Sequence, residues 1–184
     1  SYSELHVIQP DGDITPFVTG QVNIGNIGWT PDGQHITFTT KRDSDQYSTI
    51  YRTALSRGEA QAMIKPEGSV QGYSFAPDGR FVAVITAPPE SKARKAEKEM
   101  GFSQIIFEEE WRANQLTIHN LDEDSLENID LDGSVQQVRW SPAGDRLAIS
   151  ITPRQLVDDT LMFKRIRIIS PEGETLGRVE NPGK

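Results

Sequence analysis

The feature that most constrains this chain is a motif that occurs three times, over 24–40, 69–86 and 134–152. In each copy an aromatic residue is followed by a small residue, a proline, one further residue and a glycine, and then by alternating or β-branched apolar residues. The proline fixes φ near −65°, and the glycine takes the positive φ that closes a tight turn. Each copy is therefore predicted to form a strand, a turn and a second strand.

The residue between proline and glycine differs in one copy. Asp32 and Asp78 occupy it in the first two copies, and each can accept a hydrogen bond from its own turn backbone. The third copy has Ala143, which removes that bond but leaves Pro142 and Gly144 in place. We expect the third turn to keep its backbone path.

A second pattern follows each copy: apolar residues at every other position, on both sides of a turn rich in Gly, Asp, Glu and Ser. This is typical of a half-buried hairpin. Each repeat is therefore predicted to contain about four strands. Residues 5–19 match this second hairpin alone, which predicts the outer half of a preceding unit.

The spacing of the repeats predicts the fold class. Pro31 and Pro77 are 46 residues apart, close to the roughly 40 to 50 residues of one propeller blade. Pro77 and Pro142 are 65 apart, and the extra residues predict a short charged helix, capped by Ser91 and ended by Gly101. We therefore predict an all-β fold, a partial β-propeller of four-stranded antiparallel blades. The predicted divisions are an outer half-blade over 1–20, a blade over 21–66, a blade over 67–133 with a helical insert over 89–111, and a blade over 134–184.

The number of predicted blades indicates whether the chain can form a closed propeller. Three and a half blades give roughly 14 strands, whereas a closed ring needs about four to eight blades. We expect the chain to be part of a larger protein, or to self-associate through its open propeller edges. The recurring aromatic residues Trp29, Phe75 and Trp140 are expected in the cores between blades.

Composition excludes several classes of protein. The net charge of −8, without a stripe of Lys and Arg, argues against binding to nucleic acid or to anionic membranes. The absence of cysteine excludes disulfides, cysteine-bound zinc and thiol nucleophiles, but leaves cytoplasm and periplasm equally open. No apolar run is long enough to span a bilayer, so we expect a soluble protein.

These motifs resemble a known family. WTPDGQHITFTT and its two copies are similar to the propeller repeat of the TolB-like proteins and of the prolyl oligopeptidase family of serine peptidases. The stretch IIFEEEWRANQLTIHNLD and the late segment WSPAGDRLAISITPRQLVDDTLMFKRIRIISPEGE, followed by NPGK, resemble the acylaminoacyl-peptidase and dipeptidyl-peptidase-like branch. The resemblance covers nearly the whole chain.

The resemblance implies a propeller that sits over an α/β-hydrolase domain of the same parent chain and limits access to it. A Ser-Asp-His triad in that domain would perform the chemistry. This sequence contains no G-x-S-x-G motif, and the nearest string, GSVQG at 68–72, places its serine wrongly. We therefore predict no catalytic residue in this chain.

Two functions follow from the resemblance. The first is a non-catalytic propeller segment that gates or recognises peptide substrates for a serine peptidase. The second is a TolB-like scaffold for protein–protein interaction without enzymatic activity. A sugar- or metal-processing propeller enzyme would instead need converging carboxylates, which the spacing does not demonstrate.

The most distinctive polar cluster lies at the end of the insert, around Trp111. The carboxylates of Glu109 and Glu110 could bind the α-ammonium group of a peptide, and FEEEW is similar to the glutamate motif of dipeptidyl peptidases. We name Glu109, Glu110 and Arg112 as candidate substrate-binding residues. The alternative, a solvated loop paired with the lysines of 92–98, is favoured because charge runs usually face water.

The remaining titratable residues are assigned to structural positions, and no metal or cofactor site is predicted. The histidines fall in separate predicted strands, and the acidic pairs match no calcium-binding loop, whereas Asp is common in hairpin turns. These residues are His6, His35 and His119, and the pairs Asp11/Asp13, Asp43/Asp45, Asp122/Asp124 and Asp158/Asp159.

Overall fold

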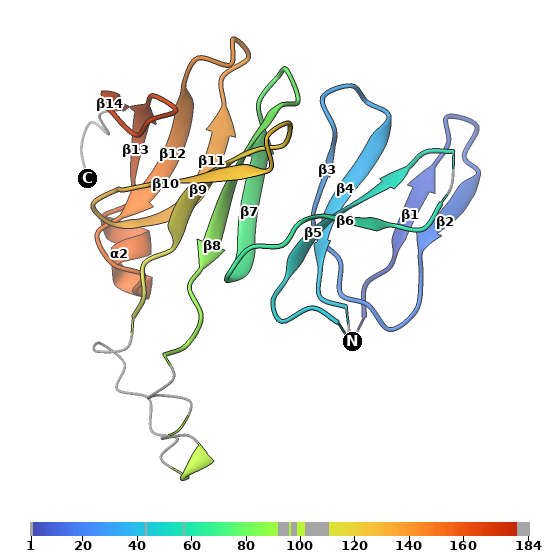
Figure 1. The fold of residues 1–184 in the computed structure, drawn as a ribbon, viewed down its shortest axis with the longest axis horizontal. Coiled ribbons are helices and arrows are strands. Elements are labelled where there is room, and N and C mark those ends of the chain that lie inside the picture. Colours follow the sequence, from blue (N-terminus) through green and yellow to red (C-terminus); the bar gives the residue numbers. More distant parts are fainter. Residues whose placement is uncertain are drawn as a thin grey trace.

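The computed structural model describes residues 2–42, 44–56, 58–91, 96, 99–101 and 111–179. These residues form one two-stranded and three four-stranded antiparallel sheets (Figure 1). Within each four-stranded sheet the strands lie side by side in the order in which they occur along the chain. The predicted all-β partial propeller is confirmed.

The half-blade contains β1 (Leu5–Ile8) and β2 (Ile14–Val18). Blade 1 contains β3 (Gly25–Trp29), β4 (His35–Thr40), β5 (Thr49–Ala54) and β6 (Gln61–Ile64). Blade 2 contains β7 (Ser69–Phe75), β8 (Phe81–Ala87), β9 (Gln115–Asn120) and β10 (Ser125–Ile129). Blade 3 contains β11 (Ser134–Trp140), β12 (Leu147–Thr152), β13 (Arg165–Ile169) and β14 (Thr175–Val179), and a short helix α2 (Val157–Met162) lies between β12 and β13.

The repeated turn has the predicted geometry in all three blades. Gly33, Gly79 and Gly144 have φ of 68°, 75° and 73°. In each turn the glycine N–H donates to the carbonyl oxygen three residues earlier, at 2.8 to 3.0 Å. Figure 1 shows the three turns at the upper end of neighbouring sheets. The position that a Cβ on Gly144 would occupy lies 3.4 Å from Pro77 of the preceding turn, so the turns also pack on one another.

The side chains in these turns also behave as predicted. Oδ1 of Asp32 and of Asp78 accepts the backbone N–H two residues later, at 3.0 Å in both cases. The third turn persists without this bond, and Asp145 instead accepts the Ser141 hydroxyl at 2.8 Å. Hydrogen bonds from Arg146 and Ser141 lower the pKa of Asp145 to about 2.

The blades are joined by apolar side chains that alternate along the second strand of each blade. In β8, Val82 and Val84 belong to the cluster shared with blade 1, whereas Ala83 and Ile85 belong to the cluster shared with blade 3. All four side chains are fully buried. Because successive side chains of a strand point to opposite faces, this strand contributes to two cores at once.

One predicted core residue is exposed. Each repeated aromatic residue lies on the face toward the preceding sheet, where Phe75 and Trp140 pack against buried clusters. Trp29 pairs with Ile36 and shares its face, yet Trp29 is 54% exposed. The prediction that Trp29 is buried core is therefore wrong. The half-blade supplies only two outer strands, so none of the described residues replaces the inner strands that would cover this side chain.

The helical segments are short. In the insert, the Met100 N–H donates to the Ala96 carbonyl oxygen at 3.0 Å, as in an α-helix, and Gly101 has φ of 92°. Most of the predicted insert helix lies outside the described residues. The helix α2 was not predicted from the sequence. It is held by Arg154, whose Nε donates to the buried Asp159 at 2.8 Å.

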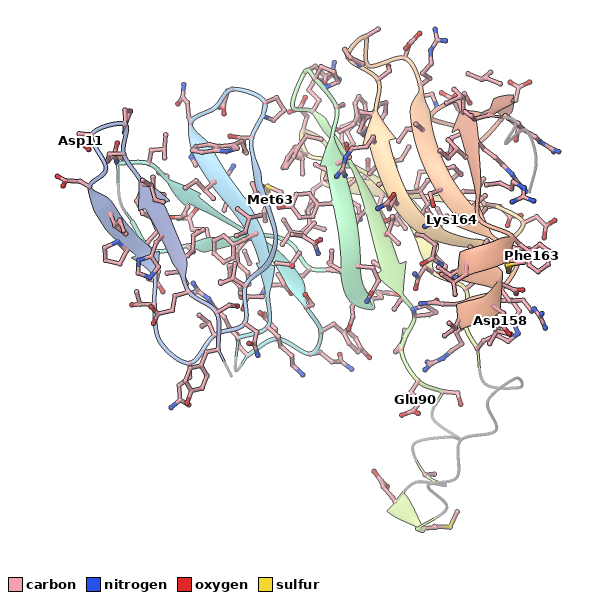
Figure 2. All side chains as sticks on the ribbon, turned by 180° about the vertical axis from the view of Figure 1, so that it is seen from behind. Asp11, Met63, Glu90, Asp158, Phe163 and Lys164 are labelled. Atoms are coloured by element: carbon pink, nitrogen blue, oxygen red, sulfur yellow. The ribbon has the colours of Figure 1, made fainter. Side chains whose placement is uncertain are left out.

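Figure 2 labels Asp158 and Glu90 on the lower side of the molecule. Asp158 and Phe163 mark α2, and Glu90 marks the place where the chain leaves β8 toward the insert. None of the helices in the described ranges is long and apolar enough to cross a bilayer.

A buried carboxylate fixes the connection between β4 and β5. Asp45 is 7% exposed, and its Oδ2 accepts the Tyr51 hydroxyl at 2.6 Å and the Arg42 backbone N–H at 3.1 Å. Lys65 Nζ lies 3.7 Å from Oδ1. Burial raises the pKa of Asp45, but these hydrogen bonds and the charge of Lys65 outweigh it, so the pKa lies below its usual value.

We expect the substitution Asp45→Asn to lower the free energy of unfolding at neutral pH by about 1 to 3 kcal/mol, because it weakens the bonds to Tyr51 and Arg42. A carboxyl group with a lowered pKa in the folded state stabilises the protein above its unfolded pKa and loses this effect as the pH falls. The difference between the two proteins should therefore shrink as the pH falls below the unfolded pKa of aspartate, about 3.9. Urea unfolding at several pH values measures this difference in the free energy of unfolding. Asp78→Asn, in an exposed turn, is the control. A difference that stays constant with pH would contradict the assignment.

Candidate functional site

A hollow lies along the inner strands β3, β7 and β11. In a propeller the first strand of each blade lines the central channel, and one edge of that strand is unpaired. The pocket along these edges has a volume of about 570 Å³. It is lined by Asn26–Trp29, Pro31, Gln71–Phe75, Pro77, Ile85 and Gln136–Arg139.

The three inner strands share an irregularity. Each contains a shift in its pairing with the second strand of its blade, and each shift contains a residue with an amide side chain. These residues, here called the bulge amides, are Asn26, Gln71 and Gln136. Asn26 also has φ of 47°, which few residues other than glycine adopt and which asparagine tolerates better than most. Bulges redirect side chains, and here they bring three equivalent amides to one pocket.

Hydrogen bonds between blades hold this wall together. The Tyr73 hydroxyl donates to the Asn26 carbonyl oxygen at 2.7 Å and lies 2.8 Å from Oγ1 of Thr37. Burial raises the pKa of Tyr73 to about 12, so the phenol stays neutral at physiological pH. Between blades 2 and 3, the backbone N–H of Trp140 donates to Oγ of Ser74 at 3.1 Å. The relative position of the bulge amides is thus fixed by contacts between the inner strands.

The bulge amides were not among the predicted site residues, although the sequence contains a signal for them. An Asn or Gln stands three or four residues before each repeated aromatic residue, in all three copies. An amide side chain that recurs at nearly the same distance before the aromatic residue is the pattern that would have indicated them.

The candidate residues at the end of the insert are only partly visible. Glu109 and Glu110 lie outside the described residues. Arg112 is exposed, and its Nη1 donates to the Pro88 carbonyl oxygen at 3.1 Å. This bond joins the two ends of the insert, since residue 88 precedes it and residue 112 follows it.

The histidines lie in separate places. His6 bonds to Glu4 at 3.1 Å, and Nε2 of His119 lies 3.1 Å from Oγ1 of Thr117. Burial lowers the pKa of His119. His35 begins β4. Among the described residues, no group of three His, Asp or Glu side chains converges as metal ligands would.

Two of the acidic pairs bond to turn backbone. Asp11 accepts the Asp13 N–H at 3.1 Å. Asp45 accepts the Arg42 N–H, as described above, and Asp43 lies outside the described residues. The hydrogen bond of Asp11 agrees with the prediction that the pair Asp11/Asp13 lies in a hairpin turn.

A scan against protein-family models finds no match to this chain, and neither does a search of the curated proteins. A search of solved structures finds similar folds. TolB from Acinetobacter baumannii has a TM-score of 0.67 and 16% identity, over 98% of this chain and 38% of that one. Puromycin hydrolase has a TM-score of 0.63 and 14% identity, over 98% of this chain and 25% of that one.

The β-propeller domain of the Trilobed protease from Pyrococcus furiosus is also similar, with a TM-score of 0.52 and 14% identity, over 88% of this chain and 43% of that one. The chain spans less than half of each of these three structures. At such identities the likeness concerns the fold. The chain therefore has a TolB-like propeller fold, which the propellers of a protease and of a hydrolase share.

Proposed function

We propose that this chain is the non-catalytic propeller part of a prolyl-oligopeptidase-family serine peptidase, and that it recognises or gates peptide substrates for a hydrolase domain. The observation that carries this proposal is the pocket of about 570 Å³ along the inner strands. Its size is in the range of ligand sites, roughly 300 to 1,000 Å³. Its wall combines unpaired strand edges with the three bulge amides, so it offers hydrogen-bond donors and acceptors to a polypeptide.

The likeness to solved structures supports the same reading. A quarter of puromycin hydrolase is similar in fold to 98% of this chain, and the Trilobed protease has a propeller of related fold. A propeller that carries no nucleophile of its own would act by restricting which peptides pass its channel.

The first test uses the full-length protein encoded by the gene. A fluorophosphonate probe, which reacts with activated serines, should label it, and the labelled serine should lie outside residues 1–184. Peptide chromogenic substrates should be hydrolysed by the full-length protein but not by residues 1–184 alone. If the full-length protein is not labelled and contains no G-x-S-x-G motif, the peptidase proposal fails.

The insert supplies a second, more specific prediction. We propose that the carboxylates of Glu109 and Glu110 bind the α-ammonium group of a peptide, with Arg112 as a further substrate-binding residue. In the full-length enzyme, Glu109→Gln with Glu110→Gln should then raise KM about tenfold or more for substrates with a free N-terminus. N-acetylated versions of the same substrates are the control and should be unaffected. An unchanged KM for both kinds of substrate would show that these are solvated surface charges.

A second candidate function is a TolB-like scaffold for protein–protein interaction, without an attached enzyme. It is favoured by the TolB structure, which has a higher TM-score than puromycin hydrolase, 0.67 against 0.63. The same inner wall would then hold a segment of a protein partner. The fluorophosphonate experiment separates the two functions, because a scaffold would bind peptides without being labelled.

A further inference from the structure

Each bulge amide forms hydrogen bonds to the described residues through its side-chain NH₂ group only. The side-chain NH₂ of Gln136 donates to Oγ of Ser134 and to Oγ1 of Thr152, at 3.2 and 3.3 Å. The side-chain NH₂ of Asn26 donates to Oγ1 of Thr39 at 3.3 Å and to the Gln71 carbonyl oxygen at 3.4 Å. The side-chain NH₂ of Gln71 donates to the Ser69 carbonyl oxygen at 3.4 Å. In the described part of the chain, the side-chain oxygens of these three amides accept no hydrogen bond. The wall of the pocket therefore presents three amide acceptors.

The charge of the pocket differs from that of the whole chain. The chain has a net charge of −8. Of the described residues that line the pocket, none is acidic, and Arg139 alone is cationic. An anionic group would thus meet a favourable charge here and no neighbouring carboxylate.

Arg139 supplies the positive charge of the pocket. It is exposed and forms no ion pair with the described residues, and its Nη1 donates to the Val138 carbonyl oxygen at 3.0 Å. The backbone N–H of Trp140 donates to Oγ of Ser74 in β7 and not to β12, so it lies at the inner edge of β11. Backbone groups of residues two positions apart in a strand point to the same edge. The Val138 carbonyl, and with it the guanidinium, therefore lies at the unpaired inner edge of β11.

We propose that the bulge amides and Arg139 form a groove for an extended peptide that carries a carboxylate, either on an acidic side chain or at its C-terminus. This rests on the peptide recognition proposed above and specifies its substrate class. The free amide oxygens can accept the backbone N–H groups of a peptide, and a guanidinium binds a carboxylate through two parallel hydrogen bonds. A neutral sugar could use the amides but would have no use for the cation.

The test measures fluorescence anisotropy of labelled peptides with the full-length protein. Two peptides of about eight residues, amidated at the C-terminus, differ only in a central Glu or Gln, and a third is the Gln peptide with a free C-terminus. One of the two carboxylate peptides should bind about ten- to a hundredfold more tightly than the amidated Gln peptide. Which of them does so identifies the source of the carboxylate.

Substitutions assign this preference to the groove. Arg139→Gln should abolish the preference and leave the affinity for the amidated Gln peptide unchanged. Arg52→Gln, an exposed arginine on β5 outside the pocket, is the matched control and should change neither affinity. Gln71→Leu should weaken all three peptides about equally, and the melting temperature of each variant verifies that it is folded.

Three different outcomes would contradict the proposals. Equal affinity for all three peptides, unaffected by Arg139→Gln, overturns the carboxylate proposal but leaves peptide recognition standing. Failure to bind these peptides or a random-sequence peptide pool contradicts the proposed function as well. Displacement of the peptides by a neutral oligosaccharide, with equal effect in wild type and Arg139→Gln, would overturn the proposal by assigning the groove to sugars.

Discussion

Replacing Phe38 by alanine is expected to destabilise the protein by about 3 to 5 kcal/mol, the usual cost of removing a buried phenylalanine. Phe38 is fully buried in β4, in the cluster that joins blade 1 to the half-blade. Its ring stacks on Tyr51 with the centroids 6.1 Å apart, and Leu5 of β1 belongs to the same cluster. The half-blade has only two strands, so it depends on this contact for much of its apolar burial.

Urea unfolding followed by circular dichroism measures this loss, and hydrogen exchange locates it. Amides of β1 and β2 should exchange faster in Phe38→Ala, because their packing surface is reduced. Phe163→Ala removes the same ring from a side chain that is 49% exposed, so it should cost much less. A loss below about 1 kcal/mol in Phe38→Ala would mean that the half-blade does not pack on blade 1 in this way.

The substitution Gly133→Ala is expected to cost about 2 to 4 kcal/mol, through the backbone rather than through lost packing. Gly133 has φ of 130°, which residues with a side chain rarely adopt. A Cβ there would lie 2.5 Å from the carbonyl oxygen of Thr152 and 3.1 Å from Cγ1 of Ile151. Relief would require β11 to move away from β12, which would disturb blade 3.

A matched glycine gives the opposite expectation. Gly177 in β14 has no neighbour within 4 Å of a built Cβ and no positive φ. Gly177→Ala should leave stability unchanged or raise it by up to about 1 kcal/mol, because alanine reduces the entropy of the unfolded chain. Thermal unfolding of both variants compares them. A Gly133→Ala protein as stable as Gly177→Ala would show that β11 does not approach the end of β12 this closely.

Local chemistry made the turns and the blades predictable. Pro at the first turn position and Gly at the positive φ fix the backbone whatever lies around them, so Gly33 and its two equivalents could be assigned from the sequence. Alternating and β-branched apolar residues likewise predicted the strands, but not that a strand such as β8 is buried on both faces. The half-blade was predictable because its turn and its alternation repeat the outer hairpins.

The remaining features depend on long-range packing. Trp29 occupies the same position in its repeat as two partly buried aromatic residues, and its exposure follows from the sheet that precedes it rather than from its own sequence. The N-cap residue of α2 is Leu156, which cannot form a side-chain cap, so the sequence carried no start signal for this helix. The bulge amides become a site only because three strands from different repeats meet at one pocket.

The most direct test of the account is whether a bound peptide contacts the bulge amides. Nuclear magnetic resonance resolves the side-chain NH₂ signals of asparagine and glutamine, which can be assigned by single substitution. When the peptide that binds best is added, we predict that the signals of Asn26, Gln71 and Gln136 shift together, at one common dissociation constant. Saturable binding that shifts only signals outside the inner strands, such as Asn120 or Asn128 in blade 2, would contradict the central claim that the inner strands form the recognition surface.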